Sequence, residues 1–157
     1  MNDATSSDGT DLPVSSPSPV TLRTSSDGDA AGIGNFYQEV GGSPVFRKLA
    51  HEFYRGVAGD PLLRAMYPEK DLGPAEERLR MFLEQYWGGP KDYQEQRGHP
   101  RLRLRHNAFR ITPAARERWL LHMRAAVDSL ELSPLHEATL WAYLDRAAQS
   151  MVNTLED

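Results

Sequence analysis

The stretch TPAARERWLLHMRAAVDSLELSPLHEATLWAYLDRAAQSMV, residues 112–152, decides the fold class. Two hydroxyl–proline pairs, Thr112-Pro113 and Ser133-Pro134, each precede a run of apolar residues with helical spacing. Ser and Thr cap helices, and proline is tolerated in the first turn because no N–H is needed there. The pattern predicts two long helices. Their apolar faces comprise Trp119, Met123, Val127 and Leu130 in the first, and Ala138, Trp141, Leu144, Ala148, Met151, Val152 and Leu155 in the second.

Similar signals lie upstream of this stretch. Ser43-Pro44 predicts another helix, with Ser43 as its cap, and Leu72-Gly73-Pro74 begins a further helix that Gly88-Gly89-Pro90 ends. Asn35 to Val40 predicts a short helix before Gly41-Gly42, and Asp60-Pro61 begins a short turn. The apolar faces of the two longer helices comprise Phe46, Leu49, Phe53 and Val57, and Ala75, Leu79, Phe82, Leu83 and Tyr86.

The segment from residue 90 to residue 112 is less regular. Arg101-Leu102-Arg103-Leu104-Arg105 alternates with period two, which fits a strand as well as a short helix that begins at Pro100. The pattern leaves both open. No convincing strand pair or repeat is present elsewhere, so we predict an all-α domain.

The chain divides by composition at about residue 34. Residues 1–34 are rich in Ser, Thr, Asp, Gly and Pro, and such a segment buries too little apolar area to offset its loss of entropy on ordering. We therefore expect a disordered amino-terminal tail over residues 1–34 and a single domain over residues 35–157.

Composition limits the classes of function. The chain has 157 residues, a net charge of −4 and no cysteine, which excludes disulfides, thiolate metal sites and covalent haem attachment. No apolar stretch is long enough to span a bilayer, and Met1 to Thr10 lacks the apolar run of a secretory signal. We expect a cytoplasmic protein with no nucleic-acid or membrane partner.

The aromatic residues and the histidines raise the question of what fills the interior. The aromatics on or beside the predicted apolar faces are either plain core or the walls of a site for a prosthetic group. His106 ends the long, turn-rich segment after Gly88. We expect His51 and His136 at exposed helix positions and His99 in a turn. His122 lies next to Met123 on a predicted long helix, where a core histidine is one interpretation, and its role stays open. A lone histidine is more often structural than a metal ligand, so the residues alone leave the role of His106 open.

Two contiguous runs resemble a known family. Residues 76–90, EERLRMFLEQYWGGP, and residues 93–109, YQEQRGHPRLRLRHNAF, are similar to group II truncated haemoglobins of the O type, in the bacterial globin family. The resemblance spans roughly residues 35–153 and includes the glycine pairs Gly41-Gly42 and Gly88-Gly89. It implies a two-over-two helical sandwich around haem b.

The resemblance also implies roles for individual residues. His106 corresponds to the proximal iron ligand, and Tyr54, Tyr67 and Trp119 would donate hydrogen bonds to a bound diatomic ligand. Ala75 stands where many longer globins carry a distal histidine or glutamine. The other expected haem contacts are Arg78 and Arg105 at the propionates, with Leu79, Phe82 and Phe109 against the porphyrin.

The family suggests binding of dioxygen, nitric oxide or similar ligands, with redox chemistry favoured over bulk oxygen delivery. Whether the protein is an enzyme stays open: nitric oxide oxidation and peroxidase-like activity both need an external reductase, since no flavin or nicotinamide motif is present. A homodimer is also left open. The alternatives are a haem-based gas sensor or oxygen carrier acting with a partner, and a haem-free module that binds phosphates or nucleic acid. That module would use Arg97, Arg101, Arg103, Arg105 and Arg110.

Overall fold

The computed structural model describes residues 36–155, and these residues form helices and turns with no strand among them. This confirms the predicted all-α class. The predicted tail, residues 1–34, lies outside the described residues, so the division into tail and domain stays a prediction. After a helical turn at residues 36–39, the elements are α2 (Ser43–Ala58), α3 (Pro61–Arg64), α4 (Gly73–Tyr86), α5 (Asp92–Arg97), α6 (Leu102–His106), α7 (Pro113–Ser129) and α8 (Pro134–Met151).

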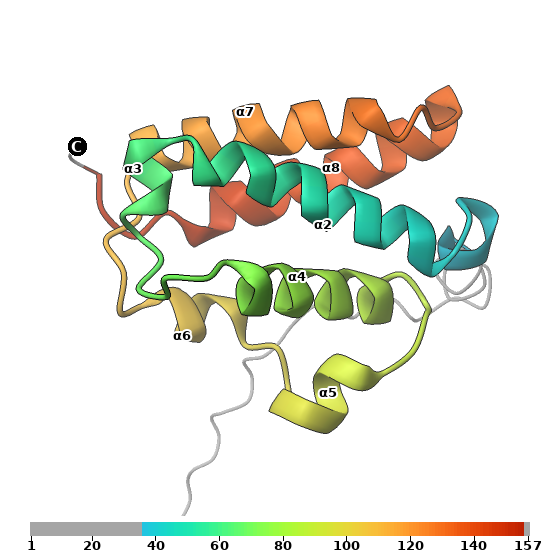
Figure 1. Cartoon of the computed structure of the whole chain (residues 1–157), viewed down its shortest axis with the longest axis horizontal. Helices are drawn as coiled ribbons and strands as arrows, with labels where there is room; N and C mark the ends of the chain where they lie inside the picture. The colour runs from blue at the N-terminus through green and yellow to red at the C-terminus, as the bar shows by residue number, and fades with distance from the viewer. Residues whose placement is uncertain (1–35, 156–157) are drawn as a thin grey trace, which may run out of the picture.

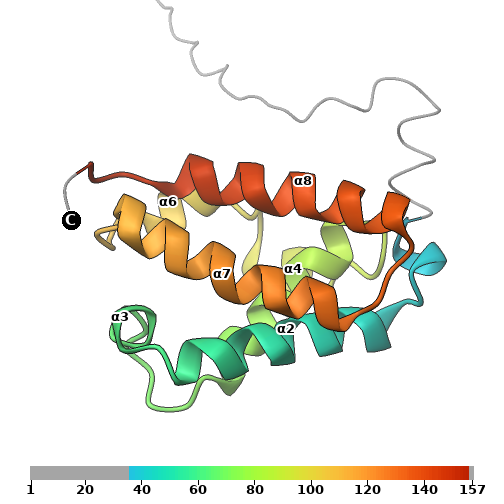
Figure 2. The ribbon, with the colours of Figure 1, turned by 90° about the horizontal axis from the view of Figure 1, so that it is seen from above.

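The four long helices form two antiparallel pairs. Helices α2 and α4 run in opposite directions, as do α7 and α8 (Figure 1). Figure 2 shows α7 between α2 and α8 when the molecule is seen from above, and α2 packs along α7. The short helices α3, α5 and α6 lie in the connections. This is the predicted two-over-two arrangement.

The apolar faces predicted from helical spacing form the core. Phe46, Leu49, Phe53 and Val57 of α2 are buried, as are Met123 and Val127 of α7 and Leu140 and Leu144 of α8. Gly56 permits a close approach of α2 to α7, because a Cβ at this position would lie 2.5 Å from Nδ1 of His122. The core therefore lies where α2 crosses the carboxy-terminal pair.

Capping explains where α7 and α8 begin. The Thr112 hydroxyl accepts a hydrogen bond from the Ala115 amide at 3.1 Å, and the Ser133 hydroxyl accepts one from the His136 amide at 3.4 Å. Asp60, at the turn predicted from Asp60-Pro61, caps α3 in the same way through Leu62 and Leu63. These hydrogen bonds satisfy amides that have no partner within the helix.

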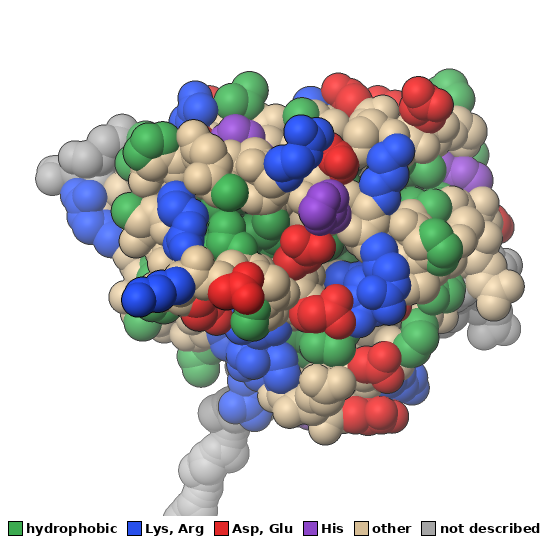
Figure 3. Space-filling model, viewed as in Figure 1, with side chains coloured by type: hydrophobic (Ala, Val, Ile, Leu, Met, Phe, Trp, Pro, Cys, Tyr) green, Lys and Arg blue, Asp and Glu red, His purple; other side chains and the backbone are tan. Residues whose placement is uncertain are grey.

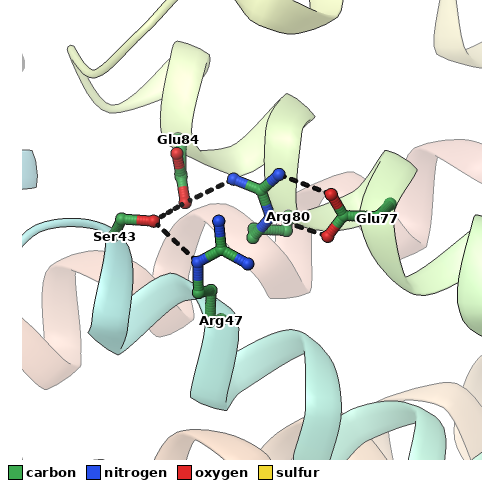
Figure 4. A network of polar contacts seen from close by, with 5 residues as sticks. All are labelled: Ser43, Arg47, Glu77, Arg80 and Glu84. Carbon is green, nitrogen blue, oxygen red and sulfur yellow. Dashed lines mark hydrogen bonds and ion pairs between the residues drawn. The ribbon is translucent and has the colours of Figure 1, made fainter.

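The predicted cap at Ser43 is wrong. Gly42 occupies the cap position of α2, and Ser43 is the first helical residue. Its hydroxyl instead donates to Oε2 of Glu84 on α4 at 2.8 Å and accepts from Nε of Arg47 at 3.2 Å (Figure 4). The capping signal is local in sequence, whereas the Ser43 hydroxyl is hydrogen-bonded to Glu84, which is 41 residues away.

A buried ion pair extends this contact between α2 and α4. Nη1 of Arg80 donates to the same Glu84 oxygen at 3.1 Å, and the Arg80 guanidinium also binds Glu77 at 2.9 and 2.7 Å (Figure 4). Glu84 is 2% exposed and Arg80 is 8% exposed, so removing either partner would leave an unpaired buried charge. The hydrogen bonds that Arg80 donates to Glu77, the largest cause, and to Glu84 raise the pKa of Arg80 above its ordinary value.

The ambiguous segment 101–105 is helical. Residues Leu102–His106 form α6, which excludes the strand alternative, and the sequence analysis did not anticipate α5. A period-two run forms a strand only beside a partner strand, and the described residues supply none. Arg105 closes the turn before α6, since its guanidinium donates to the carbonyls of Pro100 at 2.6 Å, Arg97 at 2.7 Å and His99 at 3.1 Å.

Candidate functional site

A cavity of about 490 Å³ lies within the helical framework. Small-molecule and cofactor sites typically have volumes of roughly 300–1,000 Å³ and mostly apolar walls with a few polar groups. Here the walls come from all seven helices α2 to α8 and from the loops after α3 and α6, and most lining side chains are apolar or aromatic. The cavity has the size and chemistry of a site for a bulky, largely apolar cofactor.

The structure gathers the predicted site residues around this cavity, with one exception. Ala75 is 2% exposed on α4, belongs to the buried core, and is not among the residues that line the cavity. All the others line it: His106, Tyr54, Tyr67, Trp119, Arg78, Arg105, Leu79, Phe82 and Phe109.

Of the five histidines in the chain, only His106 lines the cavity. Its Nδ1 lies 2.6 Å from the carbonyl oxygen of Leu102, one helical turn earlier in α6. A carbonyl only accepts, so Nδ1 carries the hydrogen and Nε2 carries the lone pair. This hydrogen bond fixes the tautomer and the orientation of the ring, which is how metal-binding histidines are usually held.

The remaining histidines have other partners or positions. Nε2 of His122 lies 2.7 Å from Oδ2 of Asp60, which also accepts from Nε of Arg118 at 2.8 Å. The hydrogen bond from His122, the largest effect, and that from Arg118 lower the pKa of Asp60 from 3.8 to about 2. His51 is exposed, as expected, and lies 3.4 Å from Glu76, whereas His136 is half-buried and lies 3.0 Å from Glu39. The sequence did not reveal the Asp60–His122 pair, because 62 residues separate the two.

Two tyrosine hydroxyls meet at the cavity. The Tyr54 hydroxyl on α2 donates to that of Tyr67, in the loop after α3, at 3.4 Å. In this arrangement the hydrogen of the Tyr67 hydroxyl remains available to a ligand. Burial, the main cause in both, raises the pKa of Tyr54 well above its ordinary value of 10.0 and also raises that of Tyr67. Both phenols are therefore neutral at pH 7 and able to donate.

Trp119 brings a third donor to the same cavity. It lies on α7 with its ring 5.2 Å from that of Phe53 between centroids, at an interplanar angle of 59°. Phe53 in turn contacts Tyr54 edge-on at 4.9 Å. Phe53 thus packs between the two donor side chains. An indole N–H only donates, so Trp119 suits a ligand that carries negative charge.

Arginines and one glutamate bring charge to the cavity. Arg78 on α4 forms an ion pair with Glu69, in the loop after α3, at 3.0 Å. Oε1 of Glu69 and Nε of Arg116, in two residues that also line the cavity, are buried without a hydrogen-bond partner within residues 36–155. Arg105 and Arg97 lie over the Tyr93 ring at 5.6 and 5.7 Å. The cavity therefore combines apolar walls with cationic groups, which suits an apolar ring system that carries carboxylates.

The segment that follows His106 is tied to the end of α8. The Asn153 side-chain amide donates to the carbonyls of Phe109 at 3.0 Å and His106 at 3.4 Å, and its oxygen accepts from the Ile111 amide at 2.9 Å. Helix α6 itself buries no residue, so polar contacts of this kind hold it in place. The sequence analysis missed Asn153, because nothing in the local pattern links it to His106.

The donor set and the shape of the cavity fit a haem group. One neutral imidazole nitrogen is an axial donor that haem iron accepts, apolar side chains suit the faces of a porphyrin, and arginines suit its propionates.

Comparison with known proteins identifies the family. The family model described as "Bacterial-like globin" matches residues 35–153. Group 2 truncated hemoglobin YjbI of Bacillus subtilis is 38% identical over 115 residues, which cover 73% of this chain and 86% of that protein.

Solved structures agree with this family match. The structure of a thermostable haemoglobin from the actinobacterium Thermobifida fusca is 63% identical, with a TM-score of 0.76 over 77% of this chain and 98% of that one. That of a truncated oxygen-avid haemoglobin from Bacillus subtilis is 37% identical, with a TM-score of 0.71 over 75% of this chain and 98% of that one.

The two-over-two helical fold, together with these neighbours, defines a truncated globin. The chain belongs to the bacterial-like globin family, and within it to the group II truncated haemoglobins. Globins bind haem and, through it, dioxygen and other diatomic ligands. None of the helices within residues 36–155 has the length and apolar character needed to cross a membrane.

Proposed function

We propose that this protein holds haem b through Nε2 of His106 and binds dioxygen or a similar diatomic ligand next to Tyr54, Tyr67 and Trp119. The observation that carries the proposal is the contact between Nδ1 of His106 and the Leu102 carbonyl oxygen. This hydrogen bond of 2.6 Å leaves Nε2 as the ring nitrogen with a lone pair, and the side chain lines the cavity. When bound, haem supplies an iron centre that takes a diatomic ligand and exchanges electrons.

The neutral phenols and the indole give the ligand a set of hydrogen-bond donors. Hydrogen bonds to charged groups contribute roughly 1.5–3 kcal/mol each, and 1.4 kcal/mol corresponds to a tenfold change in affinity. Two such bonds slow the escape of a negatively polarised ligand by about a hundredfold to ten-thousandfold if their effects add. Slow release favours redox chemistry over rapid oxygen delivery.

The redox role that we propose is nitric oxide oxidation or a peroxidase-like reaction, with electrons from a separate reductase. Transport of oxygen and a sensor role are the alternatives, and each needs a partner. A homodimer and a cytoplasmic location stay predictions. The haem-free alternative, in which five arginines bind phosphates or nucleic acid, is disfavoured by the largely apolar cavity. On the face that Figure 3 shows, acidic and basic side chains are interspersed.

The test is the absorption spectrum of the ferrous protein with dioxygen, followed by rapid mixing with nitric oxide. We expect a stable oxygenated spectrum that converts at once to the ferric spectrum, with one equivalent of nitrate formed. A stable oxygenated spectrum without nitrate would leave binding in place and remove the dioxygenase role. The peroxidase-like role is tested separately by hydrogen peroxide turnover with a phenolic dye.

A further inference from the structure

The loop that carries Tyr67 has no regular secondary structure of its own. It connects α3 to α4 over residues 65–72, and both Tyr67 and Glu69 line the cavity from it. A loop of this kind fixes a side chain only as well as its own backbone is held. The position of the Tyr67 hydroxyl therefore depends on whatever holds this backbone.

One side chain binds three backbone carbonyls of this loop. Arg64 is the last residue of α3, and its Nη1 donates to the Tyr67 carbonyl at 3.1 Å. Its Nη2 donates to the carbonyls of Glu69 and Lys70, both at 2.8 Å. The planar Arg64 guanidinium thus donates to three carbonyls of the loop at once. Hydrogen bonds from a charged donor are stronger than those between neutral groups.

Arg64 is itself fixed by the short helix on which it lies. Asp60 caps α3, and the same carboxylate binds His122 and Arg118 of α7. The contacts therefore run from α7 through Asp60 and α3 to Arg64, and from Arg64 to the Tyr67 loop.

We propose that Arg64 is a positioning residue of the ligand site: its guanidinium holds the 67–70 backbone so that the Tyr67 hydroxyl meets Tyr54 and the ligand. Arg64 does not line the cavity, so it acts through Tyr67 rather than by touching the ligand. The same contacts place Glu69 opposite Arg78, at 3.0 Å. This inference rests on the proposed function, because it concerns the ligand that the haem would bind.

The experiment compares four haem-loaded variants with the wild type: Arg64→Ala, Arg64→Lys, Tyr67→Phe and the double variant Arg64→Ala/Tyr67→Phe. Arg55→Ala is the matched control, since Arg55 is an exposed arginine on α2 that pairs only with Glu52 among the described residues. The measurements are the dioxygen dissociation rate, the C–O stretching frequency of the carbon monoxide complex, and amide hydrogen exchange of residues 65–72.

We expect Arg64→Ala to raise the dioxygen dissociation rate at least about threefold and to shift the C–O band in the same direction as Tyr67→Phe. Lysine cannot reach three carbonyls at once, so Arg64→Lys should move both readouts the same way. Exchange in the loop should be faster in both variants, and Arg55→Ala should match the wild type. If Arg64→Ala does not fold, Arg64→Lys carries the test.

The double variant decides whether Arg64 acts through Tyr67. With Tyr67 already changed to phenylalanine, removing Arg64 should alter the dissociation rate by less than about twofold, because coupled residues are not additive. Additive effects, or an unchanged rate and C–O band in the Arg64 variants, would overturn the proposal while haem binding stands. A wild-type protein that takes up no hemin would instead overturn the proposed function, and this inference with it.

Discussion

At the scale of single residues, two histidines of this chain make different contacts through their ring nitrogens. His106 binds a backbone carbonyl through Nδ1 and keeps Nε2 for the cavity, whereas Nε2 of His122 lies 2.7 Å from the Asp60 carboxylate, away from the cavity lining. The residue pattern alone did not distinguish them. The resemblance to the family selected His106, and of the two histidines only His106 lines the cavity. Its role as the iron ligand stays a proposal.

Trp119→Phe tests the indole donor of the proposed ligand site. We expect the dioxygen dissociation rate to rise at least about tenfold, because loss of a hydrogen bond to a charged group removes roughly 1.5–3 kcal/mol. Stopped-flow replacement of dioxygen by carbon monoxide gives the rate. Trp141→Phe is the control, because Trp141 does not line the cavity. Its ring instead packs against Arg124, whose Cζ lies 4.8 Å from the ring centroid. An unchanged rate would remove Trp119 from the ligand site.

Asp60 makes stability depend on pH in a defined direction. Its pKa is lowered from 3.8 to about 2 by His122 first and Arg118 next, so the folded state favours the charged form. The stabilisation is complete above the ordinary pKa of 3.8 and is lost as the pH falls through about 2.

The corresponding variant is Asp60→Asn. At pH 6 we expect it to lower the free energy of unfolding by roughly 1–3 kcal/mol, and the difference from the wild type should shrink as the pH falls from 4 towards 2. Urea unfolding followed by circular dichroism measures both. Asp128→Asn, at a carboxylate that is 59% exposed, should change stability little. A difference that grows below pH 4 would contradict this account of Asp60.

At the scale of the elements, the sequence predicts the long helices better than the short ones. Thr112-Pro113 and Ser133-Pro134 each combine a cap with a first-turn proline, and both helices begin there. Helix α6 has no buried residue and a period-two sequence, so its helical form depends on contacts from Arg105 and Asn153. No local pattern encodes such contacts.

The same distinction applies to the site. The residues that the resemblance singled out line the cavity, except Ala75, which lies in the buried core, and their roles toward haem and ligand stay predictions. It did not supply Arg64, Asn153 or the Asp60–His122 pair, because each of these makes its contacts through backbone carbonyls or partners distant in sequence. The predicted cap at Ser43 is wrong for the same reason, because the Ser43 hydroxyl donates to the distant Glu84.

Asn153→Ala tests the tie between α8 and the His106 segment. The variant loses the hydrogen bonds to the carbonyls of His106 and Phe109 and from the Ile111 amide. We expect haem transfer to apomyoglobin to become about threefold to tenfold faster, in line with the loss of one or more ordinary hydrogen bonds. Ser150→Ala is the control, since this hydroxyl binds only its own helix, at the Ala147 carbonyl. Equal rates of haem loss would show that Asn153 does not hold His106.

At the scale of the whole molecule, the two helix pairs form a frame around the cavity, and both the long helices and the short elements contribute residues to its lining. Helices α2 and α7 carry Tyr54 and Trp119, whereas the α3–α4 connection carries Tyr67 and α6 carries His106. The helix pairs have a buried apolar core, whereas α6 and the loop after α3 are held largely by polar contacts. Substitutions of core residues in the helix pairs should therefore act on stability, and substitutions in α6, in the loop after α3 and at Tyr54 and Trp119 on ligand and cofactor binding.

The most direct test of this account is a titration of the haem-free protein with hemin, followed through the Soret band, in the wild type and in His106→Ala. We predict saturation at one equivalent in the wild type and a ferrous spectrum typical of histidine-ligated haem. His106→Ala should lose that spectrum, and added imidazole should restore it. A wild-type protein that takes up no hemin, or a variant with the same ferrous spectrum as the wild type, would contradict the assignment of His106 as the iron ligand.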